Sequence, residues 1–184
     1  MKKVQKALLV LLRAGLWESR IEDLSCFPMS AGEWKNLYLL SRQQTVTGIV
    51  FQGIQHLPEH FLPAEELLVR WMAETDAIER KNIQMNKALE LLVQWFTESG
   101  VQPVLQKGQG IASLYENPLL RECGDIDFYF DSRQMFENAF SLIRQCGLRG
   151  KVQADQSVTY AWKGVEVEHH TCLLDLHNPF LQRY

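Results

Sequence analysis

The chain has 184 residues, of which 46% are hydrophobic and 22% charged, and its net charge is −3. This composition is typical of a globular chain of one domain, or of one domain with an added helical piece, and it excludes a disordered chain. A mildly acidic protein does not bind nucleic acid through its overall charge, although a local basic groove could still do so. The four cysteines are scattered without a C-x-x-C pair, which favours reduced thiols in a cytoplasmic protein.

The opening segment, MKKVQKALLVLLRAGLWE, places lysines before an apolar run, as a secretory signal peptide does. Its uninterrupted apolar stretch covers only residues 7–12, and Arg13 ends that stretch without a small-residue cleavage site. Val4, Leu8 and Leu11 recur at helical spacing, which favours an amphipathic helix docked on a core. No stretch reaches the length of a transmembrane helix, so we expect no membrane partner.

Helical patterns continue through the first hundred residues. Ser30 is a predicted N-cap, with Glu33 in the position of its capping-box partner. A short helix is predicted over residues 46–56. Pro63 then opens a pattern of apolar residues at threes and fours that contains no Gly or Pro until Gly100. A helix of that length is unusual, so if it breaks we expect the break near the polar stretch ERKNIQMNK.

Strands and helices alternate in the second part of the chain. VQPVLQ predicts a short strand, KGQG a tight turn into the helix IASLYEN, and DIDFYF a second strand. The next helix is capped by Asp131 or Ser132 and ended by Gly147. SVTYAW and VEVEHH are predicted to form a β-hairpin, with Lys163 and Gly164 at its turn.

These elements define the fold class. We predict an α+β protein, with a helical N-terminal half followed by a small mixed β-sheet with helices on one face. The predicted boundary separates a helical region, residues 1–100, from an α/β core, residues 101–184, on which that region packs.

The strand DIDFYF carries two carboxylates on one face. Because strand side chains alternate, Asp125 and Asp127 share a face, with Cα atoms about 6.6 Å apart. The hairpin strand likewise places Glu166, Glu168 and His170 on one side. If the two strands are neighbours, three or four carboxylates converge, and such a cluster suits Mg²⁺. The alternative is an outer sheet face whose acids are simply solvated.

A glycine turn precedes this strand. A strand that turns on Gly108 and Gly110 into a helix presents backbone N–H groups, with Lys107 beside them, and this is a generic anion site. A glycine turn by itself is a weak signal. A glycine turn followed by D-x-D on the next strand and an acid on a later strand is a stronger one.

The stretch VLQKGQGIASLYENPLLRECGDIDFYF resembles the signature of the uncharacterised bacterial nucleotidyltransferase-like family, within the polymerase-beta-like nucleotidyltransferase superfamily. That signature runs L-K-G, a helix ending in L-Y, Pro, Arg and a final G-D-I-D. It is matched here by Lys107-Gly108, Leu114-Tyr115, Pro118, Arg121 and Gly124-Asp125-Ile126-Asp127. The family's later acid, two residues before a histidine, is matched by Glu168. The resemblance implies a nucleotidyltransferase-like fold.

The resemblance also implies a two-metal reaction that moves NMP from an NTP to an unknown acceptor hydroxyl. Asp125 and Asp127 would hold two Mg²⁺ ions, one of them shared with the triphosphate. Glu168 would complete the site of the other ion and help to activate the acceptor, which could be a small molecule, a protein or RNA.

The same resemblance assigns the residues that bind the nucleotide. Lys107, Gly108, Gln109 and Gly110 would contact the triphosphate. Arg121 would either contact it as well or neutralise the acids.

Two departures from the family pattern favour a different function. The usual superfamily turn is Gly-Ser, whereas Gly108 is followed here by Gln109. The chain ends at Tyr184, soon after the third acid, whereas relatives continue with a helical region, so the core is expected to be truncated at its C-terminus. The alternative is therefore a catalytically degenerate protein that serves as a nucleotide-binding or protein-interaction module. A purely structural interaction protein is a third class.

A group of metal-ligating residues near the end of the chain suggests zinc. It comprises His169, His170, Cys172, Asp175 and His177. Their spacing matches no zinc finger or H-E-x-x-H site, and strand alternation places the two adjacent histidines on opposite faces. The sequence therefore disfavours zinc.

Overall fold

The computed structural model describes residues 2–172. The internal contacts divide the chain into two compact units, and each unit takes two separate stretches. The first unit comprises residues 1–83 and 112–123, and the second residues 84–111 and 124–184. The sequence suggested a single boundary after residue 100, and the separate roles assigned to those two halves stay a prediction. Asp175 and His177, from the predicted zinc group, lie outside the described residues.

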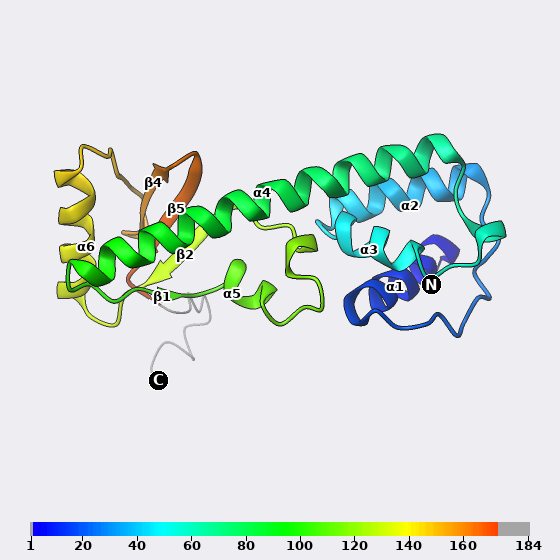
Figure 1. Ribbon diagram of the computed structural model, residues 1–184, viewed down its shortest axis with the longest axis horizontal. Coiled ribbons are helices and arrows are strands. Elements are labelled where there is room, and N and C mark those ends of the chain that lie inside the picture. The colour runs from blue at the N-terminus through cyan, green and yellow to red at the C-terminus, as the bar shows by residue number, and fades with distance from the viewer. Residues whose placement is uncertain (1, 173–184) are drawn as a thin grey trace. The chain divides into compact units, whose positions relative to one another are not determined.

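The first unit is helical (Figure 1). Its elements are α1 (Lys3–Trp17), α2 (Ala31–Gln43), α3 (Thr47–Ile54), the 3-10 helices η1 (Glu59–Phe61) and η2 (Pro118–Leu120), and the first part of α4 (Glu65–Glu98). The amphipathic opening helix is confirmed, because Leu8 and Leu11 are buried. The predicted capping box is confirmed as well. Ser30 Oγ accepts from the Glu33 backbone N–H, and a Glu33 carboxylate oxygen accepts from the Ser30 N–H.

Two glycines bring helices α1 and α3 into backbone contact. A Cβ atom added to Gly15 would lie 1.9 Å from the carbonyl oxygen of Ile49. One added to Gly53 would lie 2.0 Å from the carbonyl oxygen of Leu11. Since no side chain fits at either position, the crossing requires glycine on both helices.

The second unit is built on a five-stranded sheet within the described residues. Its strands are β1 (Val104–Leu105), β2 (Ile126–Tyr129), β3 (Lys151–Val152), β4 (Val158–Trp162) and β5 (Val165–His170), and its helices are the second part of α4, α5 (Gln109–Ala112) and α6 (Arg133–Gln145). The strand order is β1-β2-β5-β4-β3, with β2 and β5 parallel and the other pairs antiparallel. This mixed sheet confirms the predicted α+β class.

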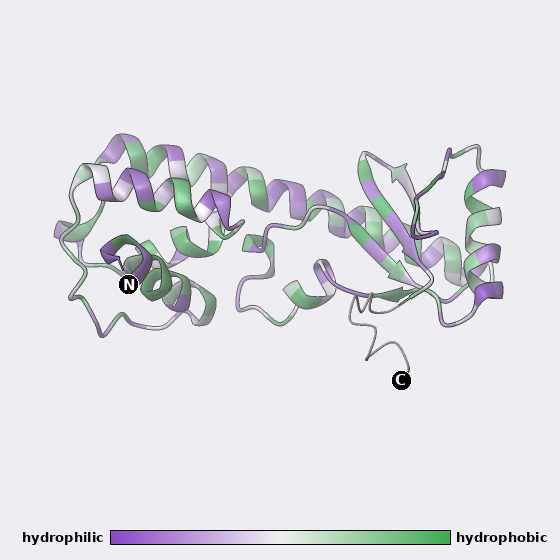
Figure 2. Cartoon of the chain, turned by 180° about the vertical axis from the view of Figure 1, so that it is seen from behind, coloured by the Kyte–Doolittle hydropathy of each residue, from purple (hydrophilic) through white to green (hydrophobic). Residues whose placement is uncertain are grey.

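One face of the sheet forms the core of the second unit. Hydrophobic and hydrophilic residues alternate along its strands (Figure 2). The ring of Phe96 from α4 contacts the rings of Phe128 and Phe130, and Phe136 from α6 contacts Phe130 as well. Helices α4 and α6 therefore cover one face, which leaves the side chains of alternate strand residues on the other.

Several local predictions for this unit are confirmed. Ser132, one of the two candidates, caps α6 by accepting from the Met135 N–H. Lys163 and Gly164 both have positive φ angles, 48° and 80°, as the turn between β4 and β5 requires.

Helix α4 is continuous over 34 residues, so the break considered near ERKNIQMNK does not occur. Two members of the polar stretch, Asn82 and Met85, are buried. The side-chain amide of Asn82 donates to the carbonyl oxygens of Leu119 and Arg121. None of the helices described between residues 2 and 172 is both long and apolar enough to cross a membrane.

The helix predicted over IASLYEN is shorter than expected. Helix α5 begins earlier, at Gln109, and ends at Ala112. Asn117 adopts an extended conformation before Pro118, and its side chain accepts from the Leu119 N–H. A residue before proline is disfavoured in the helical region, and asparagine stabilises turns, so the chain turns here where a longer helix was predicted.

Candidate metal and nucleotide site

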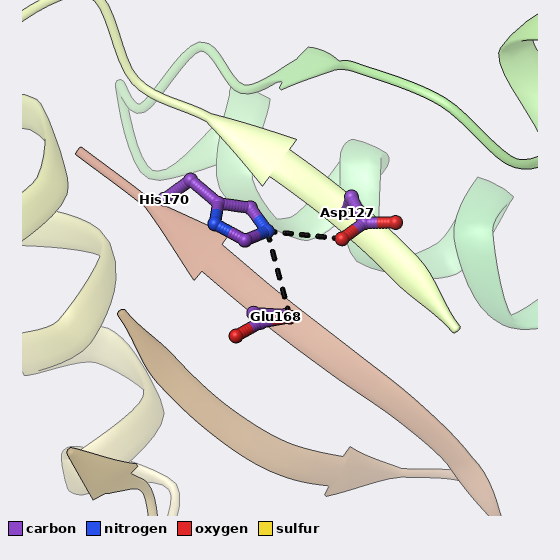
Figure 3. A group of neighbouring side chains, drawn as sticks. All are labelled: Asp127, Glu168 and His170. Carbon is purple, nitrogen blue, oxygen red and sulfur yellow. Dashed lines mark hydrogen bonds and ion pairs between the residues drawn. The ribbon is translucent and has the colours of Figure 1, made fainter. Parts of the chain in front are cut away.

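Strands β2 and β5 bring the acidic residues together. The two strands are parallel neighbours, and their register places Asp127 opposite Glu168. His170 lies two residues further along β5, on the same face as Glu168. One potential ligand atom from each of these three side chains lies within 4.8 Å of the other two (Figure 3). We call Asp127, Glu168 and His170 the acid–histidine cluster.

Asp127 is the most buried member of this cluster, with 0% of the residue exposed. Its Oδ1 atom lies 2.9 Å from His170 Nε2 and 3.1 Å from Lys107 Nζ. Its Oδ2 atom is buried and has no hydrogen-bond partner among residues 2–172. A buried carboxylate is costly unless it is paired, so one oxygen is compensated and the other is not. A fully solvated outer face does not describe this residue.

Glu168 is held by a residue that the sequence did not point to. Its Oε1 atom accepts a hydrogen bond of 2.7 Å from the hydroxyl of Ser157, which is buried. Its Oε2 atom lies 3.5 Å from His170 Nε2. Ser157 immediately precedes strand β4, the antiparallel neighbour of β5, so this contact depends on the pairing of the two strands. Glu166, the other predicted acid of β5, is exposed and outside the cluster.

The glycine turn passes close to strand β2. Gly108 has a φ of +61°, and a Cβ atom there would lie 3.3 Å from the carbonyl oxygen of Asp125. The turn directs the ammonium of Lys107 to Asp127. Partial burial acts to lower the pKa of Lys107. The hydrogen bond to Asp127 and the surrounding negative charges outweigh burial and raise this pKa above its usual value. Lys107 therefore stays charged beside the acids.

Asp125 lies next to the cluster but not within it. It directly precedes strand β2 and is half-buried. Burial raises the pKa of its carboxyl group, and the negative charge of Asp127 raises it further, whereas Lys107 acts to lower it. The structure thus joins Asp127 to Glu168 and places Asp125 in the same electrostatic field, outside the group of close ligand atoms.

The other residues predicted to bind the nucleotide lie in different parts of the chain. Gln109 is buried and begins α5. Gly110 lies in α5, where a Cβ atom would make ordinary contact with Leu105. Arg121 belongs to the first compact unit, where its guanidinium donates to Cys123 Sγ at 2.9 Å. The role of Arg121 at a phosphate stays a prediction.

The two adjacent histidines have different surroundings, as the alternation predicted. His169 is buried with 0% exposed, among the aromatic rings of the core, and its Nε2 lies 2.9 Å from the Tyr160 hydroxyl. Burial lowers the pKa of His169 to about 3. His170 instead joins the acids. The sequence placed His170 on the acidic face without a role as a ligand, and its E-x-H spacing from Glu168 was the available signal.

The cluster fits a divalent cation. It offers two carboxylates and one imidazole, and the buried Oδ2 of Asp127 has an unused lone pair. Carboxylate oxygens and imidazole nitrogens both bind divalent metals, and a bound cation would compensate the negative charge that Lys107 only partly balances.

A mixed sheet that carries acids on two neighbouring strands, beside a glycine turn with a lysine, is consistent with a nucleotidyltransferase-like fold. The chain belongs to the uncharacterised nucleotidyltransferase family, whose pattern matches residues 30–184. This match confirms the resemblance seen in the sequence, and the family implies a nucleotide substrate. Comparison with curated proteins and with solved structures gave no match.

Proposed function

We propose that the protein transfers a nucleoside monophosphate from a nucleoside triphosphate to an acceptor hydroxyl, in a reaction that depends on Mg²⁺. The observation that carries this proposal is the buried carboxylate of Asp127, which has one unpartnered oxygen and lies beside Glu168 on the neighbouring strand. Membership of the nucleotidyltransferase family supports the same chemistry.

Asp127 and Glu168 would hold one ion, and Asp125 with Asp127 a second. A bound ion would polarise the phosphate oxygens and orient them toward the acceptor. Lys107, whose side chain is 56% exposed, would contact the triphosphate once nucleotide enters. The turn at Gly108 places this lysine beside the acids, so that phosphate and metal would meet at one place.

The acceptor oxygen would form a bond to the α-phosphorus, while the bond from that phosphorus to its bridging oxygen breaks. Pyrophosphate would leave with the electron pair of the broken bond. Glu168 would hold its ion through Oε2, because its Oε1 atom is already bonded to Ser157, and the hydroxyl proton would pass to water as the acceptor attacks.

Nucleotide binding with and without Mg²⁺ tests the first half of this proposal. We expect the wild-type protein to bind NTP at least about tenfold more tightly with Mg²⁺, as loss of a charged contact would imply. Asp127→Asn should abolish that difference. Glu166→Gln is the matched control, because it removes an exposed acid from β5 outside the cluster. Equal affinities in the wild type and in Asp127→Asn would contradict the proposal.

Transfer of label from an α-labelled NTP tests the second half. The label should reach an acceptor in the wild-type protein, and Glu168→Gln should abolish its transfer. If the wild type binds Mg²⁺-NTP but releases no pyrophosphate with any acceptor fraction, the degenerate nucleotide-binding module is the correct alternative.

A further inference from the structure

His170 lies where a metal ligand would lie. Its Nε2 atom is 2.9 Å from Asp127 Oδ1 and 3.5 Å from Glu168 Oε2. Adjacent ligands of an octahedral ion, each at about 2.1 Å, are about 3 Å apart. Nε2 faces both carboxylates (Figure 3), so an ion could take all three ligands after only small movements.

Aromatic packing does not hold His170 in this position; its Nε2 atom is hydrogen-bonded to Asp127 Oδ1 and lies near Glu168 Oε2 instead. His169 supplies the buried aromatic contacts of strand β5, whereas the side chain of His170 is 20% exposed on the opposite face. The cluster also contains the unpartnered Oδ2 of Asp127, an oxygen that is fully buried. This orphaned atom is a separate indication that a ligand belongs here.

The imidazole changes which ion the site prefers. Mg²⁺ favours carboxylates, waters and phosphate oxygens, and it gains little from a nitrogen ligand. First-row transition ions accept imidazole well, and Mn²⁺ among them also keeps the oxygen-rich octahedral coordination that phosphate binding needs. Three protein ligands would leave three positions of such an ion for water and phosphate.

We infer that Asp127, Glu168 and His170 form a site of two oxygens and one nitrogen that binds Mn²⁺ in preference to Mg²⁺, with His170 as the ligand that sets the preference. The inference deepens the proposed function and rests on it for the role of the ion in nucleotidyl transfer. Mg²⁺ would still support the reaction, but at higher concentration.

Titration of the full chain with Mn²⁺ in the absence of nucleotide, followed by the loss of the free-ion signal in electron paramagnetic resonance, measures the preference. We expect wild-type protein to bind Mn²⁺ at least about tenfold more tightly than Mg²⁺, measured by competition. His170→Gln should weaken Mn²⁺ binding by about tenfold or more and Mg²⁺ binding by much less. His60→Gln, which removes an exposed histidine of the first unit, should leave both unchanged.

Pulsed electron paramagnetic resonance of Mn²⁺ bound to the wild-type protein tests the ligand directly, and this first measurement does not depend on any variant folding. The wild-type spectrum should contain couplings to a nitrogen nucleus, and the spectrum of His170→Gln should lack them. The inference is overturned if the free chain binds no Mn²⁺, if the bound ion shows no nitrogen coupling, or if His170→Gln weakens both ions equally.

These measurements separate the inference from the proposed function. If the chain binds Mn²⁺ selectively but never binds NTP, the transferase proposal is contradicted and the inferred metal site is supported. If Mg²⁺-dependent transfer is unaffected by His170→Gln and the chain shows no preference for Mn²⁺, the transferase proposal is supported and the inferred metal site is contradicted.

Discussion

At the scale of single residues, the central feature is the carboxylate of Asp127, in which only one of the two oxygens has partners. Lys107 and His170 both contact Oδ1 of Asp127, and Oδ2 has no partner. This contact makes Lys107 a competitor of any incoming cation, whereas the proposed function also makes it a ligand for phosphate. Replacing Lys107 should therefore change the affinities for metal and for nucleotide in opposite directions.

Lys107→Met should therefore weaken NTP binding and strengthen metal binding by the free protein. A hydrogen bond to a charged group contributes about 1.5–3 kcal/mol, so NTP affinity should fall about tenfold or more. Metal affinity should rise several-fold, because a positive charge 3.1 Å from Asp127 is removed. Isothermal titration measures both, with Lys151→Met on the exposed strand β3 as the control. A fall in both affinities would show that Lys107 only supports the fold.

A second prediction at the scale of single residues concerns the hydrogen bond from Ser157 to Glu168. The hydroxyl of Ser157 fixes Glu168, and groups that orient a metal ligand commonly change metal affinity by about 10–100-fold when they are removed. Ser157→Ala should lower metal affinity within that range, with a loss of stability of only about 1 kcal/mol. Ser141→Ala is the control, because it removes an exposed hydroxyl of helix α6 that accepts from Gln145. Unchanged metal affinity in Ser157→Ala would exclude an orienting role.

At the scale of elements, the crossing of α1 and α3 depends on its two glycines. In Gly53→Ala, the added methyl group would meet the backbone of Leu11 at 2.0 Å, so the two helices would have to separate. We expect a loss of about 3 kcal/mol or more in the free energy of unfolding, or no folded protein at all. Denaturation in urea measures the loss.

Gly32→Ala is the matched control for that substitution. Gly32 lies in helix α2, and no atom approaches the position of its Cβ within 4 Å. Alanine should be neutral there or stabilise the helix by up to about 1 kcal/mol. If both variants were equally stable, the close crossing would not be a determinant of the first unit.

The sequence predicts those elements whose signals are local. The capping box at Ser30, the cap at Ser132 and the turn at Lys163 and Gly164 each need only a few consecutive residues, and each is confirmed. Alternation likewise predicts which face of β5 carries Glu168. Each of these features is determined by backbone geometry over a single turn or strand.

The features that the sequence missed depend on distant contacts. Helix α4 is continuous where the sequence left a break open, and Asn82 within it bonds to carbonyl groups some forty positions away along the chain, which no local pattern shows. The burial of Asp127 follows from the pairing of β2 with β5 and from the approach of Lys107. The support of Glu168 by Ser157 needs a third strand in place. Tertiary structure thus determined what local propensity could not.

At the scale of the whole molecule, all members of the acid–histidine cluster, together with Lys107, come from the second compact unit. Ligand binding should therefore stabilise the second unit more than the first. A ligand at one hundred times its dissociation constant stabilises the state that binds it by about 2.7 kcal/mol.

Amide hydrogen exchange tests this expectation. Metal and NTP together should slow the exchange of amides in β2 and β5, and those of α1 and α3 that exchange by local opening should stay unchanged. Asp127→Asn should remove the slowing. Equal slowing in both compact units would contradict the assignment of the site to the second one.

The path of α4 has a practical consequence for dissecting the chain. Phe96, near the end of that helix, fills the core behind the sheet, and the indole N–H of Trp162 donates to the carbonyl oxygen of Ala88. A truncated protein that starts at residue 101 would lose these contacts from α4, and the apolar face of its sheet would be exposed and prone to aggregation. A protein that starts at residue 84 would retain these contacts, so the second part of α4 is needed together with the strands that carry the acid–histidine cluster.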